Sequence, residues 1–419
     1  MTTTRAAGLF YGWRVVAACF VIAAVTWALG LFGASVYLQA VTAAHGWPVA
    51  EVSFAITLFF LVSASIQRLV GRSIDRYGPR PVLTIGASCL GLGVALIGQV
   101  GAPWQLYPCF VLVGIGWSTL STTGISATVA PWFERHQGRS MTLAIMGASV
   151  GAIAGVPLLL LALRSLGLDR GLIAAGLVAV VVLLPLVWGV LRYRGPADLG
   201  LARDGLPVAG AASGQPTRTA AAGAKTGRPG VLLWTAAAGF ALALTVQIGF
   251  ITHHVALASP LVGTGAAGWL VSATGVTAFA GRLILARIVD RVDVRRLAMT
   301  ILLVQTGALL ALAAWPTVPV LVAASLVYGY GIGHITTLGP VVVRREFGAE
   351  AFGATYGAAA TVIQLTSALG PALLGLLRDG FGGYRPGLAI AAGVTTAACL
   401  ALLAGRRLGG RAAAAAEVG

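Results

Sequence analysis

The stretch Gly71-Arg-Ser-Ile-Asp75-Arg76-Tyr-Gly-Pro-Arg80 joins two long apolar runs, and a related stretch follows it 215 residues later. The second copy reads Ala286-Arg-Ile-Val-Asp290-Arg291-Val-Asp-Val-Arg295. Gly138 and Gly353 have the same spacing, and each stands at the start of an apolar run. A repeat at one fixed offset predicts a chain of two similar halves.

The composition indicates a membrane protein. Of its 419 residues 58% are hydrophobic and 10% are charged, and the mean hydropathy is +0.90. Soluble domains carry about 25% charged residues. The apolar runs are continuous and helix-sized, unlike the alternating strands of roughly 10 residues in membrane barrels. The fold class is therefore an all-α membrane protein.

Apolar runs long enough to cross about 30 Å of hydrocarbon predict twelve transmembrane helices. They cover approximately 13–40, 50–72, 80–100, 104–131, 139–165, 169–192, 231–258, 265–290, 296–314, 317–347, 351–379 and 384–405. The predicted organisation is a six-helix bundle over 1–192, a linker over 193–230, a second six-helix bundle over 231–405 and a tail over 406–419.

The Lys and Arg residues predict the orientation. With the N-terminus in the cytoplasm, only four of the 28 fall on the outside: Arg164, Arg170, Arg378 and Arg385. Two lie within spans, and the remaining 22 are cytoplasmic. This excess follows the positive-inside rule. We therefore expect a multi-pass protein of the cell (inner or plasma) membrane, with the linker and both termini in the cytoplasm.

Several function classes are disfavoured. The net charge is +16, but the basic residues occur singly or in pairs at the ends of apolar runs, so no nucleic-acid surface is expected. The spacing of the four cysteines fits neither a disulfide framework nor a zinc site. No nucleophile–base pair, metal cluster or phosphate-binding loop is recognisable. We expect no enzymatic activity, cofactor or metal ion.

The Gly71–Arg80 stretch resembles the G-x-x-x-D-R-x-G-x-R loop motif of the major facilitator superfamily. Within that superfamily, the chain resembles the branch of the monocarboxylate transporters and the oxalate–formate antiporter. Four stretches carry the likeness: Tyr11–Val16, His45–Ser53, Trp132–Gly138 and Pro196–Gly205. The resemblance implies two pseudo-symmetric six-helix bundles, transport by alternating access with the substrate between them, and a monomer.

The sequence departs from the family pattern at several places. Pro79 lies within the first loop motif, and Asp293 replaces the glycine of the second copy, so that turn is expected to differ. Monocarboxylate transporters often carry an aspartate one turn before an arginine of helix eight, where this chain has Ala278. The helix-eleven lysine of the antiporter is replaced by Ile363 or Gln364, which favours a single-carboxylate substrate.

Arg282 is the main candidate for substrate binding. It lies eight residues before Asp290, about 12 Å into the membrane from the end of its helix. A charge there is costly unless it faces a water-filled cavity and meets an anion, and a guanidinium matches a carboxylate bidentately. In the resembling branch, an arginine at this place binds the substrate carboxylate. The alternative is a structural ion pair or a side chain that reaches the membrane surface.

Arg68 is the second basic residue within a predicted span. The repeat aligns Arg282 with Gln67, so Arg68 is rotated by about 100° from the equivalent face. It either extends to the cytoplasm, supports Asp75, or provides a second cation for a larger anion. The sequence leaves these alternatives open.

Coupling to protons has few candidate groups, because none of the twelve Asp and Glu lies near the predicted bilayer centre. The histidines of the spans are His253, His254 and His334. Histidine titrates near neutral pH and can carry a proton, although a buried histidine is more often a neutral hydrogen-bonding group. Anion exchange without a proton on the protein is the alternative.

Two further groups of residues are predicted. Polar or aromatic side chains that line a central cavity, or else pack between helices, are Tyr37, Trp117, Gln247, Tyr328, Tyr330, His334 and Gln364. Gating residues that lock one conformational state, or else build a structural turn, are Gly71, Asp75, Arg76, Arg80, Asp290 and Arg291.

The leading hypothesis is secondary active transport of a small organic anion, a monocarboxylate in the first instance, by proton symport or anion exchange. A drug–proton antiporter of the same fold is the alternative, and it requires a membrane-embedded acid, which the spans lack. A receptor would require an additional signalling domain. The predicted partners are the organic anion, a proton and the lipid bilayer. Substrate identity, transport direction and coupling ion are not fixed by the sequence.

Overall fold

The computed structural model describes residues 10–205, 230–347 and 352–418, and this part of the chain is helical without strands. The first half contains α1 (Tyr11–Leu29), α2 (Gly33–His45), α3 (Val49–Tyr77), α4 (Pro79–Ile97), α5 (Leu106–Leu120), α6 (Thr122–Val129), α7 (Gln137–Val150) and α8 (Val156–Gly189). The second half contains α9 (Val231–Ile288), α10 (Val294–Ala314), α11 (Val318–Phe347), α12 (Phe352–Ser367), α13 (Gly370–Gly380) and α14 (Tyr384–Val418).

Ten helical segments of the described chain are long and apolar enough to cross a membrane, and two of them are far too long for one crossing. These two have 53 and 58 residues, and the longer would measure about 87 Å if it were straight. Each contains a glycine with positive φ, Gly167 at 80° and Gly263 at 77°, a conformation that suits glycine. The chain reverses at both glycines. After Gly167, Gly171 packs back on Leu163, and residues from the two ends of α9 belong to one apolar cluster. Counting two legs for each long segment gives the predicted twelve crossings.

Several predicted spans are broken, which the apolar pattern did not indicate. The first predicted span divides into α1 and α2 around Gly30, where a side chain on the glycine would collide with Trp117. The Tyr37 hydroxyl donates a 2.7 Å hydrogen bond to the carbonyl oxygen of Leu29, which lies at the end of α1. At this break in the helix, the Trp117 ring thus packs against Gly30, and the Tyr37 hydroxyl provides a hydrogen-bond partner for the carbonyl oxygen of Leu29.

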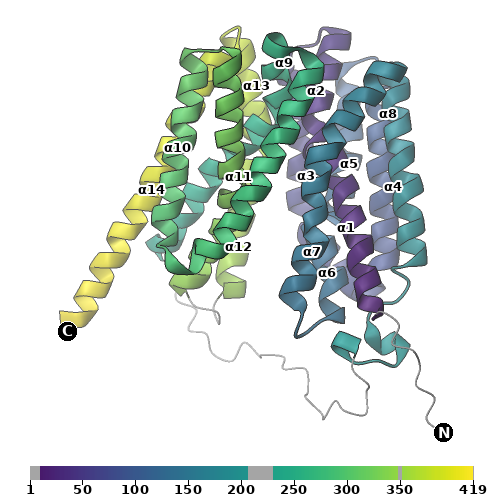
Figure 1. Cartoon of the computed structure of the whole chain (residues 1–419), viewed down its shortest axis with the longest axis horizontal. Coiled ribbons are helices and arrows are strands. Elements are labelled where there is room, and N and C mark those ends of the chain that lie inside the picture. Colours follow the sequence, from purple (N-terminus) through teal and green to yellow (C-terminus); the bar gives the residue numbers. More distant parts are fainter. Residues whose placement is uncertain (1–9, 206–229, 348–351, 419) are drawn as a thin grey trace.

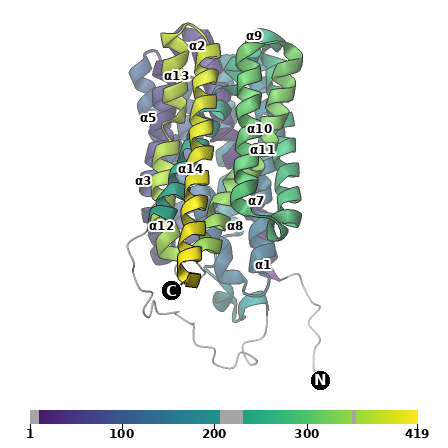
Figure 2. The ribbon, with the colours of Figure 1, turned by 90° about the vertical axis from the view of Figure 1, so that its left-hand side faces the viewer.

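The two halves lie side by side, and the described N- and C-terminal ends of the chain point to the same end of the molecule (Figures 1 and 2). We call this the terminal end and the opposite one the distal end. The ribbons of the halves converge at the distal end and diverge toward the terminal end (Figure 1). The principal contacts between the halves join α3 with α13, α2 with α9, and α8 with α9.

At the terminal end, Asp204 fastens the beginning of the predicted linker to the loop before α7. Its carboxylate accepts hydrogen bonds from the backbone N–H groups of Arg135 at 2.8 Å and Glu134 at 3.0 Å, and it lies 3.1 Å from the His136 ring. Burial alone would raise the pKa of Asp204, but these hydrogen bonds outweigh it and hold the pKa below its usual 3.8.

We expect Asp204→Asn to unfold at a temperature about 2–5 °C lower than the wild type at neutral pH. Because the folded-state pKa is depressed, the stabilisation is complete above the unfolded-state pKa and disappears as the pH falls through the folded-state value. Thermal unfolding in detergent between pH 7 and pH 3 measures this. The difference in unfolding temperature between the two proteins should be constant down to about pH 4 and should decrease toward zero below it. A constant difference at every pH would contradict the prediction.

Glycines of α7 provide a matched test of packing in the first half. A side chain at Gly147 would collide with the backbone carbonyl of Phe20 in α1, whereas no atom of the described residues lies within 4 Å of such a side chain at Gly138. We expect Gly147→Ala to destabilise the protein by about 1–3 kcal/mol. Gly138→Ala should be neutral or stabilising by up to about 1 kcal/mol. Thermal unfolding of both variants tests this, and equal effects would contradict the described α1–α7 contact.

Candidate functional site

Arg282 lies on the face of α9 that meets the first half. Gly268, Gly275 and Arg282 are spaced by seven residues, so they follow one stripe of the helix. A Cβ at Gly275 would lie 2.9 Å from the Cβ of Ala152, and one at Gly268 would collide with Leu160 of α8. The two glycines therefore define the side of α9 that approaches the first half, and Arg282 continues it toward the terminal end.

The adjacent face of α9 is fixed against α11. A Cβ at Gly281 would lie 2.6 Å from the carbonyl oxygen of Tyr330, and one at Gly333 would collide with the carbonyl oxygen of Ala278. This close backbone contact holds α9 in place. Arg282 follows Gly281 directly, so its side chain is rotated by about 100° from this contact.

The guanidinium of Arg282 has no hydrogen bond or ion pair with any described residue, although the side chain is half-buried. Ala278, one turn earlier, is buried against α11 and carries no charge. A partly desolvated cation without a counter-ion is unfavourable. The arrangement is suited to an anion that supplies the missing partner.

The residue equivalent to Arg282 in the first half is Gln67, 215 positions earlier. Its side-chain amide donates to Thr123 Oγ1 at 2.7 Å and accepts from Gln364 Nε2 of α12 at 3.2 Å. The equivalent position on α3 thus faces the opposite half, as expected from the repeat. Gln67 was not among the predicted site residues, although its alignment with Arg282 was a signal that could have identified it.

The three predicted histidines lie in different environments. His334 is fully buried beside Gly281; its Nδ1 lies 2.9 Å from the carbonyl oxygen of Tyr330, while its Nε2 has no partner in the described chain. The His254 side chain is hydrogen-bonded within the second half, where its Nε2 lies 2.9 Å from Ser325 Oγ. His253 contacts residues of both halves near the distal end.

The predicted lining residues do not form one cluster. Tyr37 and Trp117 belong to the break between α1 and α2, and the buried Tyr328 packs its ring on Phe250 at 4.3 Å. Gln247 is buried, and its side-chain oxygen has no partner among the described residues. Tyr330 packs beside His334 at 4.5 Å, and Gln364 binds Gln67. Gln364, Tyr330, His334 and Gln247 therefore stay candidates for contact with a solute.

Arg68 is exposed on α3 and has no hydrogen bond or ion pair with the described residues. Its neighbour Gln67 faces the other half, so Arg68 is turned away by about 100°. This geometry favours the interpretation that Arg68 reaches toward the terminal end rather than the substrate.

The repeated loop motifs hold each half together at the terminal end. Arg80 lies over the Trp188 ring at 4.1 Å, and Arg295 donates to the carbonyl oxygens of Leu402 and Leu232 at 3.0 and 3.2 Å. Asp75 and Arg76 are exposed, and a side chain at Gly71 would meet no atom of the described chain within 4 Å. Arg291 ends a short 3₁₀ helix, and the side chain of Asp290 lies outside the described part of the structure.

The two motif turns differ, as the substitution at Asp293 predicted. Gly78 of the first copy has a φ of 87°, whereas Asp293 has a φ of −69° and accepts hydrogen bonds from the N–H groups of Arg295 and Arg296 at 3.0 Å. Aspartate thus caps α10 where the first copy uses the conformational freedom of glycine.

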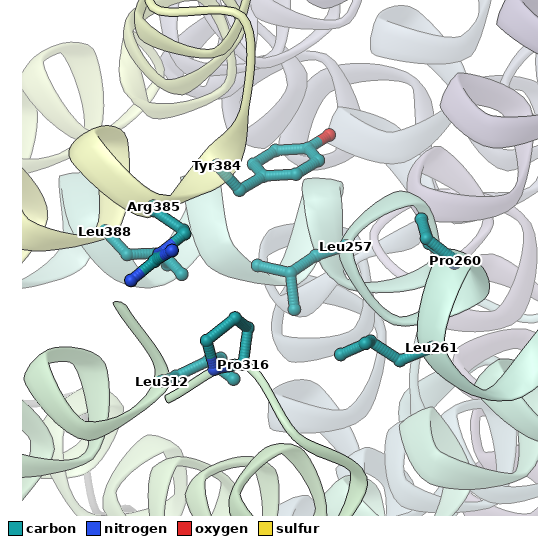
Figure 3. Close-up of a pocket in the computed structure, with 8 residues that line it drawn as sticks. All are labelled: Leu257, Pro260, Leu261, Leu312, Pro316, Tyr384, Arg385 and Leu388. Carbon is teal, nitrogen blue, oxygen red and sulfur yellow. The ribbon is translucent and has the colours of Figure 1, made fainter. Parts of the chain in front are cut away.

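A separate pocket of about 180 Å³ lies at the distal end, between α9, α10 and α14 (Figure 3). Its lining is mainly apolar, and Tyr384 and Arg385 form one side (Figure 3). The Arg385 guanidinium donates to the carbonyl oxygens of Ala313 and Ala314 at 2.9 and 3.0 Å. The cation of this pocket therefore already has acceptors, unlike Arg282.

Comparison with known proteins agrees with this architecture. The chain is 28% identical to monocarboxylate transporter 13 of Bos taurus over 391 residues, which cover 91% of this chain and 86% of the relative. It is 26% identical to the oxalate:formate antiporter of Oxalobacter formigenes over 36% of this chain and 35% of that protein. It is also 30% identical to the multidrug resistance protein MdtH of Shigella dysenteriae over 38% of this chain and 40% of that protein.

Solved structures share the fold at low sequence identity. A bacterial homolog of the human lysosomal transporter Spinster, in an inward-facing and occupied conformation, has a TM-score of 0.70 at 16% identity, covering 96% of this chain and 98% of the other. The nucleoside transporter NupG has a TM-score of 0.71 at 15% identity, covering 95% and 99%. The model of the Major Facilitator Superfamily matches residues 16–264 and 231–417, and so covers both halves. This protein belongs to the major facilitator superfamily and is a multi-pass membrane transporter.

Proposed function

We propose that this transporter carries a small organic anion, with monocarboxylates as the substrate class, and that Arg282 binds the carboxylate. The observation that carries the proposal is the half-buried guanidinium on the face of α9 toward the first half, with no anionic partner in the described chain. A carboxylate would accept two parallel N–H bonds from it. The relative named monocarboxylate transporter 13 supports this substrate class.

The proposed orientation puts the terminal end in the cytoplasm. It rests on the distribution of Lys and Arg, with four on the outer side and 22 on the cytoplasmic side. The segment between the halves then acts as a cytoplasmic linker. In this orientation the halves diverge toward the cytoplasm, as in an inward-open state of a monomer that works by alternating access.

His334 is the proposed coupling group for proton symport. Its Nδ1 faces a carbonyl oxygen and therefore carries the hydrogen, which leaves Nε2 as a buried acceptor without a partner among the described residues. It packs against Gly281, directly beside the residue that would bind the anion. A proton on Nε2 would add a positive charge next to the carboxylate and so link the binding of the two.

The drug–proton antiporter is the second candidate, because part of the chain is similar to the multidrug resistance protein MdtH. A cationic drug favours a carboxylate in the transport path. The groups closest to the proposed site are instead a guanidinium, a histidine and amides, so we rank the anion first.

We expect Arg282→Gln to reduce uptake of labelled monocarboxylates into proteoliposomes by about 10- to 100-fold, the effect of losing charged hydrogen bonds. Arg287→Gln is the matched control, since Arg287 is exposed on the same helix and rotated by about 140° from Arg282. It should keep uptake near the wild-type level. Wild-type uptake in the Arg282 variant would refute the anchoring role, and extrusion of cationic dyes would favour the second candidate.

We expect His334→Gln to abolish proton-driven accumulation while anion exchange between the two sides of the vesicle continues, because exchange needs no net proton movement. His254→Gln is the control, since His254 is bound within the second half. Both activities should survive in it. If His334→Gln still accumulates substrate against a gradient when the outside is acidic, His334 is not the coupling group.

A further inference from the structure

Among the contacts between the halves, two seams are equivalent by the repeat but chemically different. One seam joins α8 and the π-helical turn before it to α9 through glycine and alkyl contacts, such as Gly268 on Leu160 and Gly275 on Ala152. The other, which we call the polar seam, joins α3 to α12 and α13, and it combines close packing of Gly375 on Ser53 with hydrogen bonds between the halves. The offset of 215 pairs Arg164 of the first seam with Asp379 of the second, so opposite charges occupy equivalent places.

The polar seam begins where Asp379 caps α3 of the opposite half. The carboxylate of Asp379 accepts a 2.6 Å hydrogen bond from the N–H of Ala50, and α3 has no side-chain cap of its own. A negative charge stabilises the N-terminus of a helix. Further along, the N–H of Ala372 donates to Thr57 Oγ1 at 3.0 Å. These contacts connect the halves near the distal end.

His253 of α9 is at the centre of this seam and contacts three other helices. Its Nε2 lies 3.0 Å from the carbonyl oxygen of Pro371 in α13 and 3.3 Å from Ser53 Oγ in α3. Its Nδ1 lies 3.0 Å from the hydroxyl of Tyr384 in α14. The imidazole is fully buried. One side chain thus joins α3 of the first half to three helices of the second.

The partners determine which nitrogen of His253 carries the hydrogen. A carbonyl oxygen only accepts, so Nε2–H donates to Pro371. The Ser53 hydroxyl donates to the carbonyl oxygen of Val49 at 2.7 Å, so Ser53 faces His253 as an acceptor. Nδ1 is then unprotonated and accepts from Tyr384. The neutral Nε2–H form satisfies every one of these contacts.

We propose that His253 is a proton-operated latch: the neutral imidazole holds the distal ends of the two halves together, and its protonation releases them. A proton on Nδ1 converts that atom into a donor, so the Tyr384 hydroxyl has to turn and find another acceptor. The added charge is buried against a carbonyl and two hydroxyl groups, which is unfavourable. The unfavourable contacts lie in the closed seam, so protonation favours its separation.

The charged groups that act on His253 come from α13. The carboxylate of Asp379 attracts an imidazolium and the guanidinium of Arg378 repels it, while the two form an ion pair at 2.8 Å. Tyr384 of α14 is the remaining titratable partner, and α3 contributes the uncharged Ser53. An imidazolium that draws Asp379 away from Ala50 would also weaken the cap of α3.

The latch rests on the proposed orientation, in which the distal end is extracellular. External acid would then open the transporter toward the outside. No bond is made or broken except to the proton itself, which binds from the outer medium as the seam opens and returns there before it closes. The latch would therefore regulate access to the site, while the carboxylate binds at Arg282.

The test is a distance measurement between the distal ends of the two halves as a function of pH, without substrate. Spin labels are attached at Ala44→Cys in α2 and Thr317→Cys between α10 and α11, both exposed, with the four native cysteines replaced by alanine. We expect the population with the longer distance to increase several-fold between pH 8 and pH 5. A distribution that does not change with pH overturns the proposal.

Two substitutions isolate the histidine. His253→Gln keeps a donor and an acceptor but cannot titrate in this range, so its distance distribution should be independent of pH, whereas His254→Gln should respond like the wild type. A wild-type pH response in His253→Gln overturns the proposal. Ser53→Ala removes one contact and should raise the open population at every pH while the pH response remains.

The same measurement separates this proposal from the proposed substrate. Arg282→Gln should keep the pH response, because Arg282 is not part of the latch. A pH-dependent distance without carboxylate transport would support the latch and refute the proposed anion substrate. Carboxylate transport with a distal distance that does not change with pH would support the proposed substrate and refute the latch.

Discussion

The positive charge of Arg282, within the apolar zone, constrains the functional interpretation of this transporter. Arginine at the centre of a membrane helix costs about 2.5–3.5 kcal/mol on insertion scales, and Arg282 has neither an acidic neighbour nor a hydrogen-bond acceptor among the described residues. Close packing of Gly281 and Gly333 fixes the helix that carries it. Among the described residues this cation is uncompensated and held in a defined place on the face of α9 toward the first half, which is the basis for the proposed anion binding.

The chemical difference between the seams gives each a separate role. Glycine and alkyl contacts between α8 and α9 have no directional bonds to break, so these helices can slide or pivot at low cost. The contacts of α3 with α13 include hydrogen bonds to Asp379 and Thr57, and His253 of α9 bonds to both helices. A change of state has to exchange these polar contacts for others. In the proposed latch, the polar seam controls access while the apolar seam stays in contact.

The sequence predicted the architecture well, because apolar length and the repeat are strong signals. The twelve crossings, the family and the different turn at Asp293 followed from them. The breaks at Gly30 and between α12 and α13 were missed, since they depend on tertiary contacts such as that of Trp117. The environment of Arg282 could be predicted in part from its depth and the repeat. The contacts of Gln67, His253 and Asp379 join residues about 200 to 330 positions apart, which no local pattern reveals.

The most direct measurement of the central claim compares the binding of a monocarboxylate with that of its uncharged amide, which has almost the same shape. Isothermal titration of the purified wild-type protein with both compounds isolates the charge of the ligand. We expect the carboxylate to bind at least about tenfold more tightly, because only the anion compensates the guanidinium of Arg282. Equal affinity for the acid and the amide, or binding of cationic compounds in place of both, would contradict it.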